Sequence, residues 1–399
     1  MATEKDFLKS MVKNLQKNIK DIEIIENSNL VSIKEFINTG NYIFNAHLSG
    51  SLFGGIPSNR SVLIAGEPGT GKTFLSLNIC REAQKMGYSI FYFDSEAAID
   101  AQTTKNFGIN PSKFVHILVN TIQDFGHYIN NLILEIKKIK ESIPDAKFLI
   151  VLDSLGNLSS QQEKNIFLEN KEAKDMTKQQ LIRSVFRTIT TDLSKLDIPF
   201  IVTNHTYQNM TNPYAGAGIS GGLGAIFNAS IAVVLSKAKL KEDDGDKNEN
   251  LQSNGIIVTS TIHKSRFTKP IKVRFKISNT TGMNKFVGLE QYVSFESCGV
   301  GRGNVLTQKE FEKQKPEKYY ELDVNGEKMY FVQKDTAKQF IVYDNGELRQ
   351  VPLKEFFTSK VFSENVLKKL DENVIKPTFK LPDNLQEDNE GVDSLIDAD

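Results

Sequence analysis

The chain has 399 residues, 39% hydrophobic and 25% charged, which are ordinary values for a globular protein of two or three domains. Its 49 basic and 49 acidic side chains cancel, so a nucleic-acid partner would need a local basic surface and not bulk positive charge. No apolar run is long enough to span a membrane, the first residues lack a signal-peptide core, and two cysteines (Cys80 and Cys298) cannot build a disulfide framework, so we expect a cytoplasmic protein.

Residues 1–38 are predicted to form an N-terminal helical segment that could mediate oligomerisation. Over the first 30 residues, apolar side chains recur at spacings of three and four among lysines, at Phe7, Leu8, Met11, Leu15, Ile19 and Ile22. Such a helix can pack on its own domain or dock on a neighbouring subunit, and the pattern leaves both possibilities open.

Residues 39–298 are predicted to form the core. Six short runs that are apolar on both faces alternate with helical segments, at 61–66, 89–94, 147–153, 199–204, 230–236 and 255–261. Between them, residues 121–141 carry an apolar stripe at helical spacing that is too short for a coiled coil. The alternation predicts an α/β fold with a mostly parallel central sheet flanked by helices.

Three further segments follow. The polar stretch 237–255 is expected to be an exposed hairpin tip or loop. Residues 299–380 are expected to form a small C-terminal domain, α/β or mostly helical, with a capping box at Thr307 and Glu310 and a hairpin that turns at Asn325 and Gly326. Residues 381–399 contain seven acidic side chains and no basic one, and we expect a disordered acidic tail.

The first apolar strand runs directly into a glycine-rich turn. The turn, Gly66, Glu67, Pro68, Gly69, Thr70, Gly71, Lys72 and Thr73, matches the pattern G-x-x-x-x-G-K-[ST] between a strand and a helix. Its glycines let backbone amides face inward as an anion nest, and the N-terminus of the following helix adds partial positive charge. Lys72 would reach the β- and γ-phosphates, and the Thr73 hydroxyl would coordinate Mg²⁺. We therefore predict a site for a nucleoside triphosphate and Mg²⁺.

Polar residues close three more strands. Asp153 ends an apolar strand after the glycine-rich turn, which is the arrangement of a carboxylate that supports Mg²⁺. Asp94 and Glu96 follow another strand, and either could orient and deprotonate an attacking water. Asn204 and His205 close a further strand. Because parallel strands present their carboxyl ends at one edge, we expect these groups to surround one ligand crevice.

Three segments carry candidate nucleic-acid contacts. Two long polar or glycine-rich connections follow Asp153 and His205, and Arg183 and Arg187 lie on the helix after the first of them. The most basic stretch, 263–276, contains Lys264 and Arg266 two residues apart. Alternatively, the two arginines could simply lie on a solvated helix face. The basic stretch could be an edge strand whose charges prevent pairing with another chain.

In this order, the motifs resemble the RecA recombinase family, and in detail the phage UvsX-type recombinases, over residues 39–278. The resemblance implies that Glu96 activates the water for ATP hydrolysis. It also implies that His205 senses the γ-phosphate, where bacterial RecA has glutamine, and that Lys264 and Arg266 reach the ATP of a neighbouring subunit.

The resemblance further assigns segments 156–176 and 206–225 to two DNA-binding loops, with Arg187, Gly221 and Gly222 at positions that face DNA. Thr103 falls near the position where bacterial RecA stacks a tyrosine on adenine, so the contact to the base is expected to differ.

The implied activity is that of a DNA-dependent ATPase that forms helical filaments on single-stranded DNA and catalyses homologous pairing and strand exchange. It would serve recombination, repair and recombination-dependent replication. The implied partners are single- and double-stranded DNA, further copies of the chain, a single-strand-binding protein and a loading or mediator protein, with no membrane. If the chain is phage-encoded, it acts in the host cytoplasm.

Two other functions suit the same core. One is a ring-forming helicase or motor, against which the closely spaced Lys264 and Arg266 argue. The other is a nucleotide-binding assembly factor without productive turnover, against which the complete set of Lys72, Thr73, Glu96 and Asp153 argues.

Overall fold

A computed structural model describes residues 4–28, 30–169, 175, 177–207, 218–219, 223–239, 255–278 and 281–382. Most of the stretch 237–255, which was expected to be a loop, and nearly all of the acidic tail lie outside these described residues. None of the described helices is both long and apolar enough to cross a membrane.

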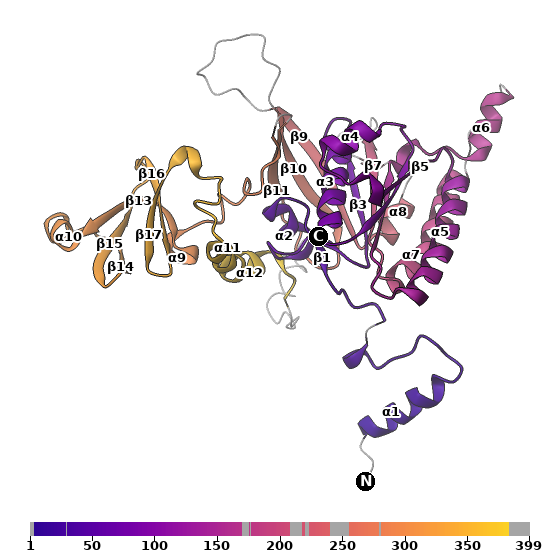
Figure 1. Ribbon diagram of the computed structural model, residues 1–399, viewed down its shortest axis with the longest axis horizontal. Helices are drawn as coiled ribbons and strands as arrows, with labels where there is room; N and C mark the ends of the chain where they lie inside the picture. The colour runs from indigo at the N-terminus through magenta and orange to yellow at the C-terminus, as the bar shows by residue number, and fades with distance from the viewer. Residues whose placement is uncertain are drawn as a thin grey trace, which may run out of the picture.

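The core is a ten-stranded sheet with the order β12-β11-β10-β9-β3-β7-β6-β4-β5, and β8 pairs with β7 (Figure 1). The bounds are β3 Ser61–Gly66, β4 Ser89–Asp94, β5 Phe114–Leu118, β6 Phe148–Asp153, β7 Phe200–Tyr207, β8 Gly218–Ile219, β9 Ile231–Lys239, β10 Gly255–Ser265, β11 Val273–Ser278 and β12 Gly282–Met283. From β9 through β5 neighbouring strands are parallel, whereas β10, β11 and β12 are antiparallel. The predicted mostly parallel sheet with flanking helices is confirmed.

The strand β5 was not predicted, and its burial explains why. It is the edge strand beyond β4, and its residues are half-buried or exposed, with Val115 45% and Leu118 58% exposed. The continuous apolar pattern that marks a buried strand is therefore missing.

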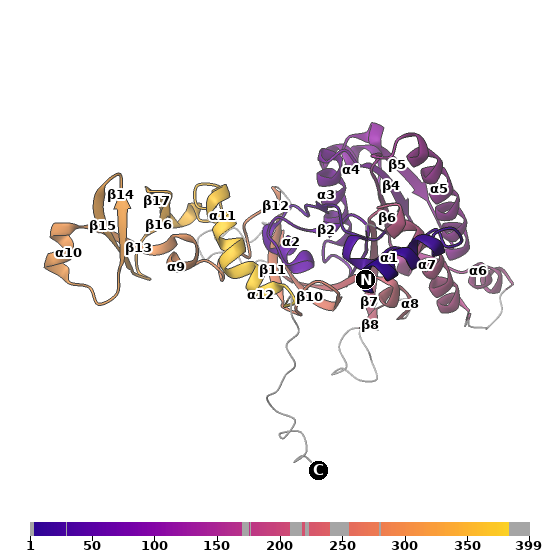
Figure 2. The same ribbon diagram turned by 90° about the horizontal axis from the view of Figure 1, so that it is seen from below.

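Helices cover the two faces of the sheet (Figure 2). On one face, α3 (Lys72–Lys85) packs through residues such as Leu75 and Ile79 with Val62 and Ile64 of β3. On the other face, α5 (Ile122–Ser142) and α7 (Lys178–Lys195) pack with Leu63. In the predicted stripe of α5, Ile122, Phe125, Ile129 and Ile136 are buried, whereas Leu132 is partly buried and Ile139 is 39% exposed. Adjacent residues of β3 thus serve opposite faces, as the pleat of a strand requires.

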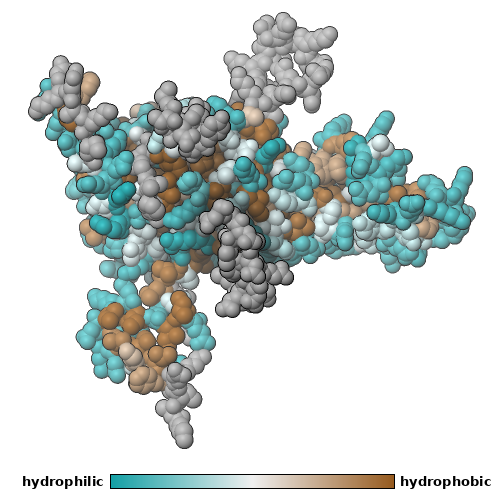
Figure 3. Space-filling view, turned by 180° about the vertical axis from the view of Figure 1, so that it is seen from behind, coloured by the Kyte–Doolittle hydropathy of each residue, from teal (hydrophilic) through white to brown (hydrophobic). Residues whose placement is uncertain are grey.

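The N-terminal helix is shorter than predicted. The helix α1 spans Glu4–Leu15, after which bonds of the i→i−3 type, such as Asn18 N–H to the Leu15 carbonyl, close a turn. Phe7 is 66% and Met11 49% exposed, and Figure 3 shows apolar side chains on this segment where it stands away from the core. Most of the stability of a helix in a protein comes from packing one face against other elements. This helix has no packed face, so its ends gain little stability from additional turns. The stripe is open to solvent within this chain.

The segment between α1 and the glycine-rich turn joins the core through short elements. These are a 3-10 turn at Ile25–Asn27, β1 (Phe36–Ile37) paired with β2 (Ile56–Pro57), and α2 (Tyr42–Ser49).

The C-terminal part is built on strands and is not mostly helical. A five-stranded antiparallel sheet has the order β14-β15-β13-β16-β17 and lies apart from the core sheet (Figure 1). Its strands are β13 Val300–Thr307, β14 Tyr320–Val324, β15 Glu327–Gln333, β16 Gln339–Asp344 and β17 Glu347–Pro352, with α9 at Phe295–Cys298 and α10 at Gln308–Gln314. Two of its hairpins, β14–β15 and β16–β17, each turn over two residues, which is a common connection between antiparallel strands.

The two local predictions in this part are confirmed. The Thr307–Glu310 capping box starts α10. The hairpin β14–β15 turns at Asn325 and Gly326, which have φ values of 54° and 85°. The boundary at residue 299 stays a prediction, since Val300 and Val342 share one apolar cluster with Val62 of the core.

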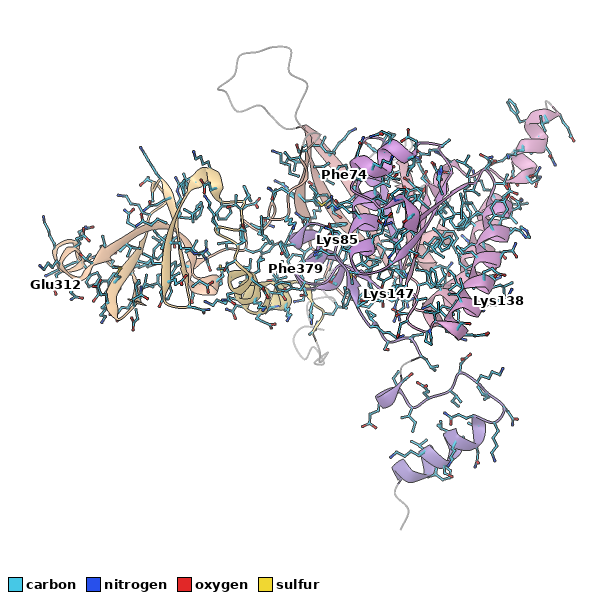
Figure 4. The ribbon with its side chains drawn as sticks, in the orientation of Figure 1. Phe74, Lys85, Lys138, Lys147, Glu312 and Phe379 are labelled. Atoms are coloured by element: carbon cyan, nitrogen blue, oxygen red, sulfur yellow. The ribbon has the colours of Figure 1, made fainter. Side chains whose placement is uncertain are left out.

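The last helical segments tie this part to the core. A π-helical turn, Asp371–Ile375, follows α11 (Glu364–Leu370), and its first residue, Asp371, accepts hydrogen bonds from the Ser51 hydroxyl at 2.7 Å and the Leu52 amide at 2.6 Å. α12 (Lys376–Phe379) then lies beside the core, where Figure 4 labels the buried Phe379. The Phe379 carbonyl accepts from the Lys269 amide at 2.8 Å. The end of α12 is thereby held next to the turn that follows β10.

Candidate active site

The polar strand ends meet at one edge of the sheet. Gly66 at the end of β3 is level with His205 of β7, and Asp94 of β4 is level with Asp153 of β6. β7 does not stop at Asn204 as predicted but continues to Tyr207, where it pairs with β8. His205 therefore lies inside a strand, paired with Gly66 of β3 and directly before the two residues that pair with β8.

The glycine-rich turn has the backbone that its sequence requires. Gly69 and Gly71 adopt φ values of 73° and 87°, in the left-handed region. A Cβ on Gly71 would lie 2.6 Å from Ile277 Cδ1, and one on Gly66 would lie 2.7 Å from Thr70 Oγ1. Side chains at these positions would fill the cradle, which fits a loop whose amides approach phosphate oxygens.

Lys72 is folded onto this loop. Its ammonium donates to the carbonyl oxygens of Gly66 at 2.9 Å and Glu67 at 3.1 Å. The side chain is buried, and this burial lowers the pKa of Lys72 from its ordinary value. The carbonyls hold the ammonium where an incoming phosphate would compete for it.

Asp153 is the centre of a buried hydrogen-bond network. Its carboxylate accepts from Thr73 Oγ1 at 2.7 Å, from the Tyr92 hydroxyl at 2.6 Å and from Thr203 Oγ1. Burial, followed by the charge of Asp153, raises the pKa of Tyr92 well above its ordinary value. Neither Tyr92 nor Thr203 was predicted, although a hydroxyl inside an otherwise apolar strand is a signal that could have identified them.

The hydroxyl of Thr73 and the carboxylate of Asp153 form an oxygen pair that suits Mg²⁺. Among the described residues, no three His, Cys, Asp or Glu side chains gather as a metal cluster. An ion held here would therefore depend on phosphate oxygens and water for its other ligands, as Mg²⁺ in nucleotide sites commonly does.

The two carboxylates after β4 have different surroundings. Asp94 is 2% exposed and accepts from the Glu96 amide at 2.9 Å and the Ile99 amide at 3.2 Å, while His116 Nε2 lies 3.0 Å from its second oxygen. These contacts commit Asp94 to shaping the loop. Glu96 is the carboxylate that remains free to face a substrate, with its side chain 32% exposed.

Glu96 is joined to His205 through Ser154. Ser154 Oγ lies 2.9 Å from Glu96 Oε1 and 3.2 Å from His205 Nε2, and the carboxylate and imidazole are themselves 3.2 Å apart. Ser95 holds Ser154 by accepting from its amide at 2.8 Å and donating to its carbonyl at 2.7 Å. Three strands thus contribute to one cluster, in which Ser154 was not predicted.

Lys264 and Arg266 lie at the opposite edge of the sheet. Lys264 on β10 pairs with Ala232, which is level with Leu63, whereas Gly66 is level with Leu235. Along β9, Ala232 and Leu235 are three residues apart, which separates Lys264 from the level of Gly66 by roughly 10 Å. The glycine-rich turn lies further along in the same direction. Neither basic residue reaches the glycine-rich turn of its own chain.

The two basic residues do not lie on one strand. β10 ends at Ser265, and the exposed Arg266 lies in the bend that follows. The hydroxyl of Ser265 accepts from the amides of Phe267 and Thr268, which turns the chain away from the strand. The Lys264 ammonium donates to the Ile226 carbonyl of α8 (Leu223–Asn228) at 3.1 Å.

The candidate DNA-binding residues are only partly described. Arg183 and Arg187 are exposed and one turn apart on α7, and a Cβ on Gly224 of α8 would lie 2.5 Å from Arg183 Cγ. Gly221 and Gly222 lie outside the described residues. The first expected loop contains a helix that was not predicted, α6 (Gln161–Leu168), which begins with a capping box at Ser160 and Glu163.

Thr103 lies in the first turn of α4 (Ala101–Asn106), where its amide donates to the Asp100 carboxylate at 2.6 Å. This contact caps the helix through the backbone.

Known proteins share this arrangement of motifs. A family model described as the RecA N-terminal domain matches residues 5–284, which include every strand-end group described above. The recombination and repair protein of Enterobacteria phage T4 is 28% identical over 239 residues, which are 59% of this chain and 57% of that protein. Protein RecA of Phytoplasma mali is 26% identical over 267 residues, 66% of this chain and 74% of its own length. Protein RecA of Mesomycoplasma hyopneumoniae is 30% identical over 185 residues, 46% of this chain and 52% of that protein.

Proposed function

Since the chain belongs to the RecA family, we propose that it is a DNA-dependent ATPase that forms helical filaments on single-stranded DNA and catalyses homologous pairing and strand exchange. The observation that carries this proposal is the common edge where Lys72, Asp153, Glu96 and His205 meet. The matched part is 57% of the phage T4 protein, so the complete activity is inferred from the site and from the family together.

Each group at this edge has a defined task in ATP hydrolysis. Lys72 would exchange its two loop carbonyls for phosphate oxygens, and the loop amides would hold the remaining phosphate charge. Thr73 and Asp153 would hold Mg²⁺, which supplies positive charge to the phosphates. Glu96, with Ser154 and His205 in hydrogen-bond contact, would orient the attacking water and accept its proton.

The position of the basic pair supports a site that two subunits share. Lys264 and Arg266 lie at the edge opposite to the glycine-rich turn, so they would complete the site of a neighbouring copy. Such a head-to-tail contact joins two different surfaces of neighbouring copies. When the rotation that relates one copy to the next does not close into a ring, repeated contacts build a helical filament. ATP would then stabilise the assembly, and hydrolysis would weaken it.

A link from this interface to DNA is available in α8. The Lys264 ammonium contacts the Ile226 carbonyl, and Arg183 packs against Gly224 of the same helix. We propose that ATP bound between subunits draws Lys264 toward phosphate and so alters α8 and the adjoining glycine-rich segment. DNA would be held mainly through its backbone, with homology tested by base pairing.

The proposed function also implies protein partners and a cellular location. A recombinase of this kind would act with a single-strand-binding protein and a loading or mediator protein, and in the host cytoplasm if a phage encodes it. Neither partner is named by the residues described.

The decisive assay is ATP-dependent pairing of circular single-stranded DNA with a homologous linear duplex. We expect joint molecules with homologous DNA, none with heterologous DNA, and none from Lys72→Ala, which removes the ammonium and keeps the fold. Unwinding of forked DNA without pairing would favour the ring helicase instead. Nucleotide binding without turnover would favour the assembly factor.

A further inference from the structure

A second lysine lies beside the glycine-rich turn. β9 runs parallel to β3, with Leu235 level with Gly66, so Lys237 stands two residues further along, beside the turn itself. Residues two apart on a strand share a face. Val233 and Leu235 pack with α3 in one apolar cluster, so Lys237 projects from the face that bears α3 and the phosphate-binding loop.

Lys237 touches the tip of that loop. Its ammonium donates to the Pro68 carbonyl at 2.7 Å, and a Cβ on Gly69 would lie 2.7 Å from the same nitrogen. A residue other than glycine at position 69 would therefore displace the ammonium. Because Gly69 has no side chain, the Lys237 ammonium can occupy this position.

Two ammonium groups together hold three consecutive carbonyls. Lys72 binds those of Gly66 and Glu67, and Lys237 binds that of Pro68. These contacts fix the backbone of the loop, whose glycines let amides face inward as an anion nest requires. The positive charge of Lys237 contributes to lowering the pKa of Lys72, in addition to the burial of Lys72.

We propose that Lys237 is a second lysine of the nucleotide site, which fixes the tip of the phosphate-binding loop and adds positive charge beside the bound polyphosphate. This inference rests on the proposed ATPase function and deepens it. The ligand class is the polyphosphate chain, because an ammonium recognises charge and not the base. Lys237 is exposed, so it can approach a phosphate oxygen without a large loss of hydration energy.

The test is equilibrium binding of a fluorescent ATP analogue with Mg²⁺ and without DNA, with inorganic tripolyphosphate as a competitor. Lys237→Met keeps the aliphatic stem, and we expect it to weaken binding of both ligands by roughly 10- to 150-fold, the effect of losing one charge-assisted hydrogen bond. Lys237→Arg should keep most of the affinity. Lys276→Met is the matched control, since Lys276 alternates with the buried Phe275 and Ile277 of β11 and faces away from the loop.

Affinity of Lys237→Met within twofold of the unaltered chain would overturn the inference. So would an equal loss for tripolyphosphate in Lys276→Met, because the effect would then be general charge. Loss of binding in Lys72→Ala together with retained binding in Lys237→Met would refute only the role of Lys237. A chain that binds neither ligand would refute the ATPase proposal itself. Thermal unfolding of each variant checks that it is folded.

Discussion

The two carboxylates that follow β4 should give opposite results when each is converted to its amide. Asp94 is 2% exposed and has three hydrogen-bond partners, two of them backbone amides. Asn at this position keeps one acceptor oxygen and loses the charge, and one lost charge-assisted bond costs about 1.5–3 kcal/mol. We expect Asp94→Asn to lower the free energy of unfolding by about 2 kcal/mol, seen as a lower urea midpoint.

Glu96→Gln should leave stability nearly unchanged, because the side chain is 32% exposed and Gln can still bond to Ser154. A general base contributes typically 10²–10⁴-fold, so we expect DNA-stimulated hydrolysis to fall by about that factor. Binding of the ATP analogue should stay within about twofold, because the glycine-rich loop is unaltered. The reverse pattern, with hydrolysis kept in Glu96→Gln and lost in a folded Asp94→Asn, would refute the assignment.

Three further predictions follow from buried or shared contacts. Burial lowers the pKa of His47 from 6.5 to about 3. As the pH falls below 6.5, the unfolded chain therefore binds a proton at His47 before the folded chain does. The free energy of unfolding should be about 2 kcal/mol lower at pH 5 than above pH 6.5. Urea midpoints at pH 7 and 5 should differ less in His47→Asn, and an unchanged difference would contradict this role. The variants Lys264→Ala and Glu96→Gln should each lose hydrolysis when assayed alone, but a mixture of the two should recover part of it. In the mixture, some interfaces pair an intact Glu96 of one subunit with an intact Lys264 of the next. No recovery would argue against a shared site. Asp371→Asn should lower stability by about 2 kcal/mol, because its carboxylate accepts from Ser51 and Leu52, whereas Glu372→Gln at the exposed neighbouring position should not.

The core was predictable because its signals are local or strictly periodic. Buried parallel strands are continuous apolar runs, and the phosphate-binding loop needs its glycines and lysine at fixed spacing. The Asn325 and Gly326 turn was predictable for the same reason, since both residues need a left-handed backbone.

Features that depend on distant partners were not predictable in the same way. The strand β5 is half-exposed at the edge, and the length of α1 depends on burial that this chain alone does not provide. The choice between Asp94 and Glu96 required the positions of His116, on β5, and Ser154, directly after β6. Lys237 lacked any motif, and only the register of β9 against β3 brings it to Pro68.

The central claim is that ATP at a shared interface builds filaments on single-stranded DNA. The most direct test is ATP hydrolysis with and without single-stranded DNA, with the same samples imaged by negative-stain electron microscopy. We predict hydrolysis that DNA stimulates and helical filaments that require ATP. Closed rings with stimulated hydrolysis, or neither stimulation nor assembly, would contradict the account.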